Sequence, residues 1–166
     1  MSGSTFDPAE FTLRGDDDFL RVDSLCHSLL REFHHALVAS GGVPVEATER
    51  ARSADLFVRD FVVDHLQENP FMIDGVTVVR FAASWYVTSA AEPNMKELAI
   101  HLKGVEAFAR YLHECGHMDS ARLHRIVAAA ADLPYYESRL DSYWELTAAE
   151  YRRWLDEPLL RRKGDE

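Results

Sequence analysis

Two Glu-x-x-His sequences, Glu32–His35 and Glu114–His117, are the residues whose types and spacing could bind a metal ion. Residues three apart on a helix project together, and di-iron helical bundles use this spacing on two of their helices. At about 100° per residue, however, His35 lies about 150° from the centre of its helix's apolar face. Glu114 lies about 170° from the apolar face of its own helix by the same count, and Gly116 ends that helix before His117. We therefore expect both sequences to face away from the core, and we predict no metal site and no cofactor.

Two other histidines have the opposite placement. His65 lies at the centre of the apolar stripe of the second predicted helix, and His101 lies within about 30° of the centre of the fourth helix's stripe. A histidine on an apolar face is usually a core residue whose ring nitrogens are hydrogen bonded. The alternative is an internal polar pocket, shared with Arg80, that binds a small ligand or a metal. The pattern leaves open whether the two helices are neighbours.

The segment 133–155 is rich in aromatic residues, which fall on two helical faces. Such stripes usually belong to the core, although Tyr and Trp with flanking Arg residues are also what protein interfaces favour. The segment therefore supplies candidate interface residues for a protein partner or a homodimer. These are Tyr143, Trp144, Tyr151, Trp154, Arg152 and Arg153.

Composition narrows the function classes. The chain has 166 residues and a net charge of -10, so its surface repels nucleic acid and anionic lipid, which are bound through clustered Lys and Arg. Residues 152–166 are the exception, with five basic and four acidic side chains, and they keep a nucleic-acid-associated module open as an alternative. No apolar run is long enough to cross a membrane. Cys26 and Cys115, both in apolar helical contexts, indicate a reducing cytoplasm.

Apolar residues recur at helical spacing through most of the chain and predict an all-α single-domain bundle of six to seven helices. The third predicted helix is apolar on nearly every side except a thin polar strip, so we expect it to be central. Residues 1–15 show no period and are predicted to be a mobile leader, and residues 158–166 a mobile polar tail. The bundle domain then spans residues 16–157. The predicted helices cover residues 18–40, 46–68, 75–91, 93–115, 120–131, 134–146 and 147–157.

The stretch from Phe57 to about Ile126 resembles the helical N-terminal core-binding (SAM-like) domain of tyrosine recombinases. The resemblance is carried by FVVDHL at 61–66, TVVRF at 77–81 and LKGVEAFARYL at 102–112, followed by ECGH. It implies a shared helical topology over less than half of the chain. No Arg, His and Tyr catalytic constellation follows, and the charge is negative where those domains are basic, so DNA binding is not implied.

No nucleotide-binding loop, nucleophile motif or zinc signature is present in the sequence. The sequence therefore favours a non-enzymatic cytoplasmic protein that acts as an interaction or scaffold module. The two alternatives are the ligand pocket near His65 and His101 and the basic C-terminal segment.

Overall fold

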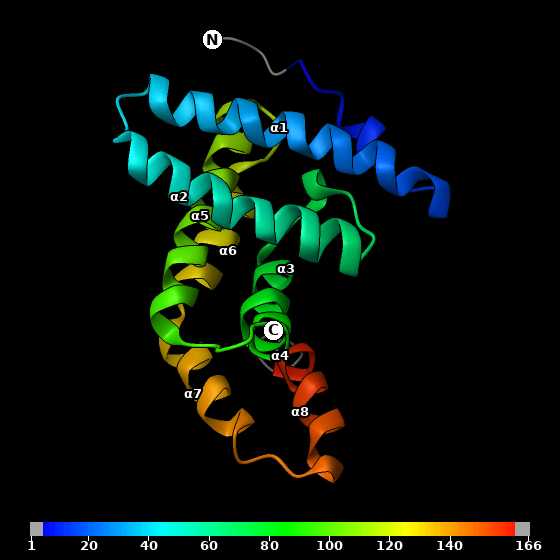
Figure 1. Ribbon diagram of the computed structural model, residues 1–166, viewed down its shortest axis with the longest axis vertical. Coiled ribbons are helices and arrows are strands. Elements are labelled where there is room, and N and C mark those ends of the chain that lie inside the picture. Colours follow the sequence, from blue (N-terminus) through cyan, green and yellow to red (C-terminus); the bar gives the residue numbers. More distant parts are fainter. Residues whose placement is uncertain (1–4, 162–166) are drawn as a thin grey trace.

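The computed structural model describes residues 5–161, and within them every regular element is helical (Figure 1). Seven continuous helical rods are present over that range, which confirms the predicted all-α bundle. Two of the rods contain a π-helical stretch, labelled η3 and η5. The rods are α1 (Phe19–Ala39), α2–η3 (Pro44–Asp55 and Leu56–His65), α3–η5–α4 (Gly75–Arg80, Phe81–Trp85 and Tyr86–Ser89), α5 (Met95–Glu114), α6 (Ser120–Ala131), α7 (Leu133–Tyr143) and α8 (Ala148–Arg161).

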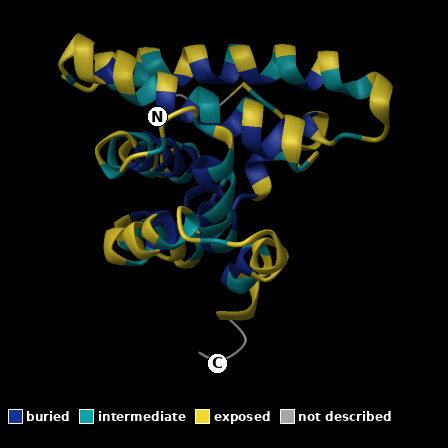
Figure 2. Ribbon diagram, turned by 60° about the horizontal axis from the view of Figure 1, so that its bottom comes forward, coloured by how far each residue is buried: buried dark blue, intermediate teal, exposed yellow. Residues whose placement is uncertain are grey.

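The rods are arranged around one another in two groups. In Figure 1, α1 and α2–η3 run side by side in opposite directions across the top of the molecule. The rod α3–η5–α4 descends from them, with α5 and α6 on one side and α8 on the other. Figure 2 shows that α1 is exposed along its outer side and buried along the side facing the other helices, as its amphipathic pattern requires.

The third rod is central, as its apolar composition predicted. It packs against α6, α7, α8 and η3, and most of its side chains are buried. Its predicted polar strip is interrupted, because Thr77 is buried at the start of the rod. The Thr77 hydroxyl accepts from the main-chain N–H of Asp74, while Asp74 caps α3 in return, so the buried hydroxyl is satisfied.

The two π-helical stretches pack against each other through aromatic rings. Phe57 and Phe61 of η3 meet Phe81 of η5 with ring centroids 5.2 and 5.5 Å apart, and Phe61 lies 5.4 Å from the Trp85 ring. A π-helix bonds residue i to i+5, so each residue advances the chain around the axis by less than in an α-helix. Side chains in and beyond these stretches therefore occupy faces that α-helical counting does not give.

The predicted leader is wrong for the residues that the structure describes. Phe11, in a short 3-10 turn (η1, Pro8–Phe11), is fully buried and its ring packs 4.8 Å from that of Phe71. The Asn69 side-chain amide also donates to the carbonyl of Pro8 at 2.8 Å. The sequence pattern did not predict this segment, because a single buried aromatic residue gives no repeating apolar pattern. Residues 1–4 lie outside the described range.

The predicted end of the last helix is also wrong. α8 continues through Pro158, which is buried inside the helix, and ends at Arg161. A proline in a helix interior has no N–H to donate to the carbonyl four residues earlier, here that of Trp154. The helix continues because another donor reaches this carbonyl, as described below. Residues 162–166, the rest of the predicted tail, lie outside the described range.

The rods α2 and α5 approach each other closely where they cross at Gly104. A Cβ at this position would lie 2.5 Å from the Ser53 Cβ and 2.7 Å from the main-chain oxygen of Arg50. Both distances are shorter than real contacts, so the helix crossing requires a residue without a side chain. The sequence placed Gly104 inside a helix, where glycine is unfavourable by about 0.5–1 kcal/mol relative to alanine.

Gly104→Ala is expected to lower the free energy of unfolding by about 1–3 kcal/mol, because overpacking at a tight contact outweighs the gain in helix propensity. Urea denaturation followed by circular dichroism measures the change. Gly15→Ala is the matched control, since no atom lies within 4 Å of a Cβ there. It should change stability by less than about 0.5 kcal/mol. Equal effects of the two substitutions would contradict the close approach at Gly104.

Candidate functional site

Residues from two separately predicted groups converge on one groove. The groove has a volume of about 370 Å³ and lies between η3, the rod α3–η5–α4 and α8. It brings His65 and Arg80, predicted for a pocket, together with Tyr151, predicted for an interface. The remaining lining residues are Phe61, Leu66, Ser84, Trp85, Thr88, Ser89, Leu155, Pro158 and Leu159.

Aromatic rings form the base of this groove. The His65 ring stacks on Phe61 at 5.9 Å, and Trp85 lies 5.4 Å from Phe61 and 6.4 Å from His65. On the rim, Arg80 forms an ion pair with Glu68 at 3.6 Å. The groove therefore combines an aromatic base with polar side chains that can orient a bound partner.

The prediction that His65 is buried at the centre of the second helix is wrong. His65 is exposed and lies at the end of η3, where the π-helical spacing has turned it away from the face that 100° per residue assigns. Its aromatic packing against Phe61 leaves one side of the ring open to the groove.

His101 does not share a pocket with His65. Trp85 and Ser89 line the groove on one side and the cavity that contains His101 on the other, so they separate the two histidines. Arg80 accompanies His65 only. A single internal pocket joining His65, His101 and Arg80, one of the alternatives from the sequence, is therefore not formed.

His101 instead has the environment of a hydrogen-bonded core histidine. Its Nδ1 lies 3.1 Å from the Ser53 hydroxyl, and its Nε2 lies 3.8 Å from a Glu97 carboxylate oxygen. Burial lowers the pKa of His101, and the nearby Glu97 carboxylate opposes this shift only in part. The neutral ring is therefore the favoured form in the folded protein, with Nδ1 able to accept the Ser53 proton.

The aromatic residues near the C-terminus form a continuous row, which we call the aromatic strip: Trp144, Tyr143, Trp154 and Tyr151. Successive ring centroids lie 5.3, 5.4 and 6.4 Å apart. The strip links the end of α7 to the groove through α8. Trp154 is only 6% exposed, however, and its indole N–H donates to the Ser142 hydroxyl at 2.9 Å. As an interface candidate Trp154 is therefore wrong, because it belongs to the protein's own core.

Arg139, which sequence reasoning did not single out, attaches α8 to the central rod. The residue is 4% exposed, and its guanidinium lies 3.7 Å over the Trp154 ring. Nε donates to the Ala83 carbonyl at 2.9 Å and Nη2 to the Trp154 carbonyl at 2.7 Å. The second of these carbonyls is the one that Pro158 leaves without a helical donor. The sequence signal for such a partner is the proline itself, placed inside an otherwise amphipathic helix.

The other acceptor of Arg139 is the Ala83 carbonyl. It lies in η5, just before the rod returns to α-helical geometry at Tyr86. The Tyr86 N–H donates to the Phe81 carbonyl with i→i+5 spacing, and side-chain donors reach two other carbonyls of this stretch. Arg139 donates to the Ala83 carbonyl, and the Thr88 hydroxyl donates to that of Ser84 at 3.1 Å.

The prediction that the Glu-x-x-His residues face outward agrees with three of the four and is wrong for His117. Glu32, His35 and Glu114 are exposed, whereas the His117 ring packs edge-on against Phe71 at 5.1 Å. Among residues 5–161, no three His, Cys, Asp or Glu side chains are grouped so that they could hold a metal ion.

The basic residues near the C-terminus are dispersed. Arg152 and Arg153 are exposed, while Arg161 packs 3.8 Å over the Tyr135 ring and pairs with Asp132 at 3.4 Å. Arg162 and Lys163 lie outside the described residues. None of the helices between residues 5 and 161 is both long enough and apolar enough to cross a membrane.

Arg139→Met is expected to lower the free energy of unfolding by about 1–3 kcal/mol, because the Trp154 carbonyl, to which Pro158 cannot donate, is left without a donor. Amide hydrogen exchange should also show lost protection in α8. Arg110→Met is the matched control, since the Arg110 side chain is half exposed and its partner Glu106 is on the same helix. It should cost less than about 1 kcal/mol. Unchanged protection of α8 in Arg139→Met would contradict the role given to Arg139.

The low pKa of His101 predicts a specific pH dependence. Because the folded protein resists protonating His101, the unfolded chain binds more protons below about pH 6.5, so stability falls as the pH is lowered through that value. In His101→Gln this contribution is absent, and the stability difference between about pH 7.5 and about pH 5.5 should be smaller than in the wild type. Urea unfolding at both pH values measures it. An equal pH dependence in both proteins would contradict the effect of burial on His101.

Comparisons with known proteins give no match for this chain: no family model, no curated protein and no solved structure is similar to it. The resemblance of residues 57–126 to core-binding domains of tyrosine recombinases stays a prediction. Function is therefore inferred from the groove, the aromatic strip and the charges around them.

Proposed function

We propose that this protein is an interaction module that forms a homodimer through the groove and α8. One observation carries the proposal: α8 presents exposed apolar side chains directly beside an aromatic groove that α8 itself helps to form. Tyr151 and Leu159 both line the groove and are 39% and 45% exposed. Large apolar side chains grouped in this way are typical of protein contact sites.

The geometry of α8 separates its contact residues from the others. At about 100° per residue, Tyr151 and Leu159 lie within about 40° of Leu155, on the side that borders the groove. Arg153 and Leu160 lie about 140–160° from Leu155 and face elsewhere. The proposed contact surface therefore contains Tyr151, Leu155 and Leu159, with Arg152 at its outer edge.

A second copy of the chain is the occupant that fits this surface. Two copies with α8 antiparallel about a two-fold axis would each insert Tyr151 and Leu159 at the partner's groove, so that one surface serves both sides. Charge supports this arrangement. Arg152 is exposed on α8, and Asp64 and Glu68 are exposed next in the chain to His65 and near Leu66, which line the groove. The surface is thus self-complementary, which matters because two chains of charge -10 otherwise repel each other.

The size of the surface predicts a weak dimer. α8 has 14 residues and is about 21 Å long, whereas a stable dimer buries about 800 Å² on each partner. Trp144, the exposed end of the aromatic strip, extends the apolar surface beyond the groove. We expect a dissociation constant of about micromolar order, the range of small interfaces.

We also propose a cytoplasmic location. Cys26 and Cys115 are free thiols, and Cys26 is buried, where burial raises the pKa of its thiol to about 12. A protonated, buried thiol resists oxidation, and unpaired cysteines are typical of reducing compartments.

The net charge of -10 argues against nucleic acid as the partner.

The double variant Tyr151→Ala with Leu159→Ala is expected to remain monomeric, while the wild type gains mass with concentration. Sedimentation velocity between about 1 and 200 µM, a range that brackets the expected dissociation constant, measures both. Leu160→Ala is the matched control on the same helix, since Leu160 is 61% exposed and faces away from the groove. It should dimerise as the wild type does. A wild type that is monomeric throughout, or a control that dissociates equally, would contradict the proposal.

A further inference from the structure

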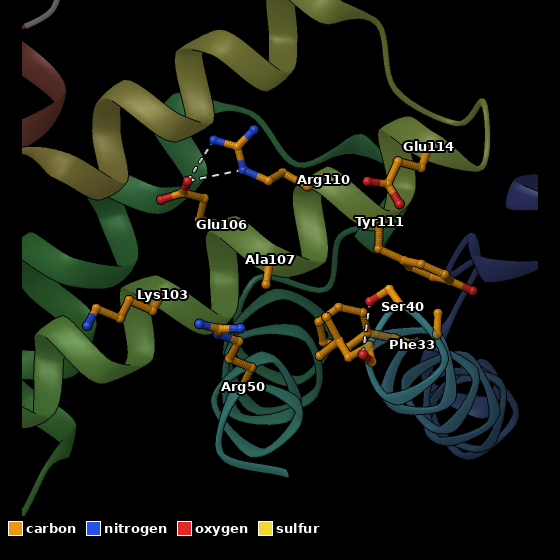
Figure 3. Close-up of a pocket in the computed structure, with 11 residues that line it drawn as sticks. Phe33, Ser40, Arg50, Lys103, Glu106, Ala107, Arg110, Tyr111 and Glu114 are labelled. Carbon is orange, nitrogen blue, oxygen red and sulfur yellow. Dashed lines mark hydrogen bonds and ion pairs between the residues drawn. The ribbon is translucent and has the colours of Figure 1, made fainter. Parts of the chain in front are cut away.

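We propose that a second site binds an organic carboxylate with an apolar body. The site is a cleft of about 460 Å³ between the C-terminal half of α1, the middle of α2 and the second half of α5 (Figure 3). It is separate from the groove, with which it shares no lining residue. The volume is within the range of small-molecule sites, about 300–1,000 Å³.

The base of the cleft is apolar. Phe33, Ala36 and Leu37 come from α1, and Ala107 and Tyr111 come from α5. The Phe33 ring packs against Tyr111 with centroids 5.4 Å apart, so the base is fixed by an aromatic pair. Such a surface suits a hydrocarbon chain or a ring.

Arg50 provides the cation at one end of this base. In Figure 3 its side chain rises from α2 on the side of Ala107 that is nearer Lys103, with Phe33 on the opposite side. Arg50 reaches this position because Gly104 lets α2 approach α5 closely, with the Arg50 carbonyl against the missing side chain. Its intrahelical contact with Glu46 is long, 4.0 Å, and both side chains are partly exposed. The guanidinium therefore has donors free for a ligand carboxylate, which it can bind through two parallel hydrogen bonds.

The other charged side chains make the two ends of the cleft differ in charge. Lys103 lies on the rim at the Arg50 end and forms no ion pair within 4.0 Å among the described residues. Arg110 is occupied by Glu106, with its Nη2 2.8 Å and its Nε 3.1 Å from Oε1. Glu114, eleven residues beyond Lys103 and thus about 16 Å along α5, lies beside Tyr111 at the other end. A ligand carboxylate is therefore attracted to the Arg50 end and repelled from the Glu114 end.

This polarity selects the ligand class. The best fit is a molecule with a carboxylate at one end and an apolar body of several carbons. Its carboxylate would bind Arg50 and Lys103, and its apolar body would pack on the base formed by Phe33 and Tyr111. A dianion with charges at both ends would meet Glu114. A neutral alcohol of the same length would fill the base but leave Arg50 without a partner.

Titration with sodium decanoate, kept below its micelle concentration, tests the proposal, with 1-decanol as the neutral analogue. Amide chemical shifts by NMR report the site, and residues 103–111 should move on adding decanoate. Arg50→Gln should weaken decanoate binding about tenfold or more, because a charge-assisted hydrogen bond contributes at least a factor of that size. Decanol binding should be unchanged by the same substitution.

Arg52→Gln is the matched control, because Arg52 is exposed on the same helix but lines a different cavity, beside His101. It should bind decanoate as the wild type does. Ala107→Leu, which fills the base, should weaken both decanoate and decanol. The proposal is overturned if decanoate does not shift residues 103–111, if Arg52→Gln weakens it as much as Arg50→Gln, or if decanol binds equally well. Binding of an acidic amphipathic peptide without decanoate binding would overturn it as well.

Discussion

The buried guanidinium of Arg139 is the interaction on which the lower half of the molecule depends. Two helices that meet there are irregular: α8 contains Pro158, and the central rod changes from π- to α-helical spacing after Trp85. Pro158 cannot donate to the Trp154 carbonyl, and a buried carbonyl without a donor is costly. Arg139 reaches the carbonyls of Ala83 and Trp154 with one planar group. One side chain of α7 thus binds both the proline-containing helix and the π-helical stretch, and it joins α7, α8 and the central rod.

The position of the groove depends on these contacts of Arg139. Because α8 is held by its Trp154 face, the side of the helix with Tyr151, Leu155 and Leu159 is left toward η3 and Trp85. The π-helical stretches supply the opposite wall, since they bring Phe61, His65 and Trp85 to one surface. π-Helical segments occur frequently at functional sites, and here two of them border the same groove. Irregular backbone therefore shapes the surface, while the regular helices α1, α2 and α5 provide the separate cleft at Arg50.

The sequence predicted the regular helices well because their information is local and repetitive. Val22, Cys26, Leu29 and Phe33 recur at helical spacing and are all buried in α1, and the apolar third helix is central. Prediction failed where a single residue determines the structure and gives no repeating pattern, or where a residue lies in an environment unusual for its type. Phe11 is a single anchor, Arg139 is a charged residue in the core, and Pro158 lies inside a helix. His65 was misplaced because its face was counted at α-helical spacing across a π-helical stretch. The sequence pattern grouped Tyr151 with Trp154 as interface candidates, whereas Tyr151 is exposed beside the groove and Trp154 is buried.

The π-helical stretch η3 has a consequence for how this chain tolerates changes in length. A π turn accommodates an additional residue relative to an α turn, so removing one residue between Leu56 and His65 would restore α-helical bonding without breaking the rod. Side chains inside the stretch would then follow one another at about 100° instead of at the smaller π-helical step, so their faces would change relative to one another. The aromatic wall of the groove would be lost although no residue in it had been replaced. The groove is therefore encoded by the number of residues in this segment as much as by their identities.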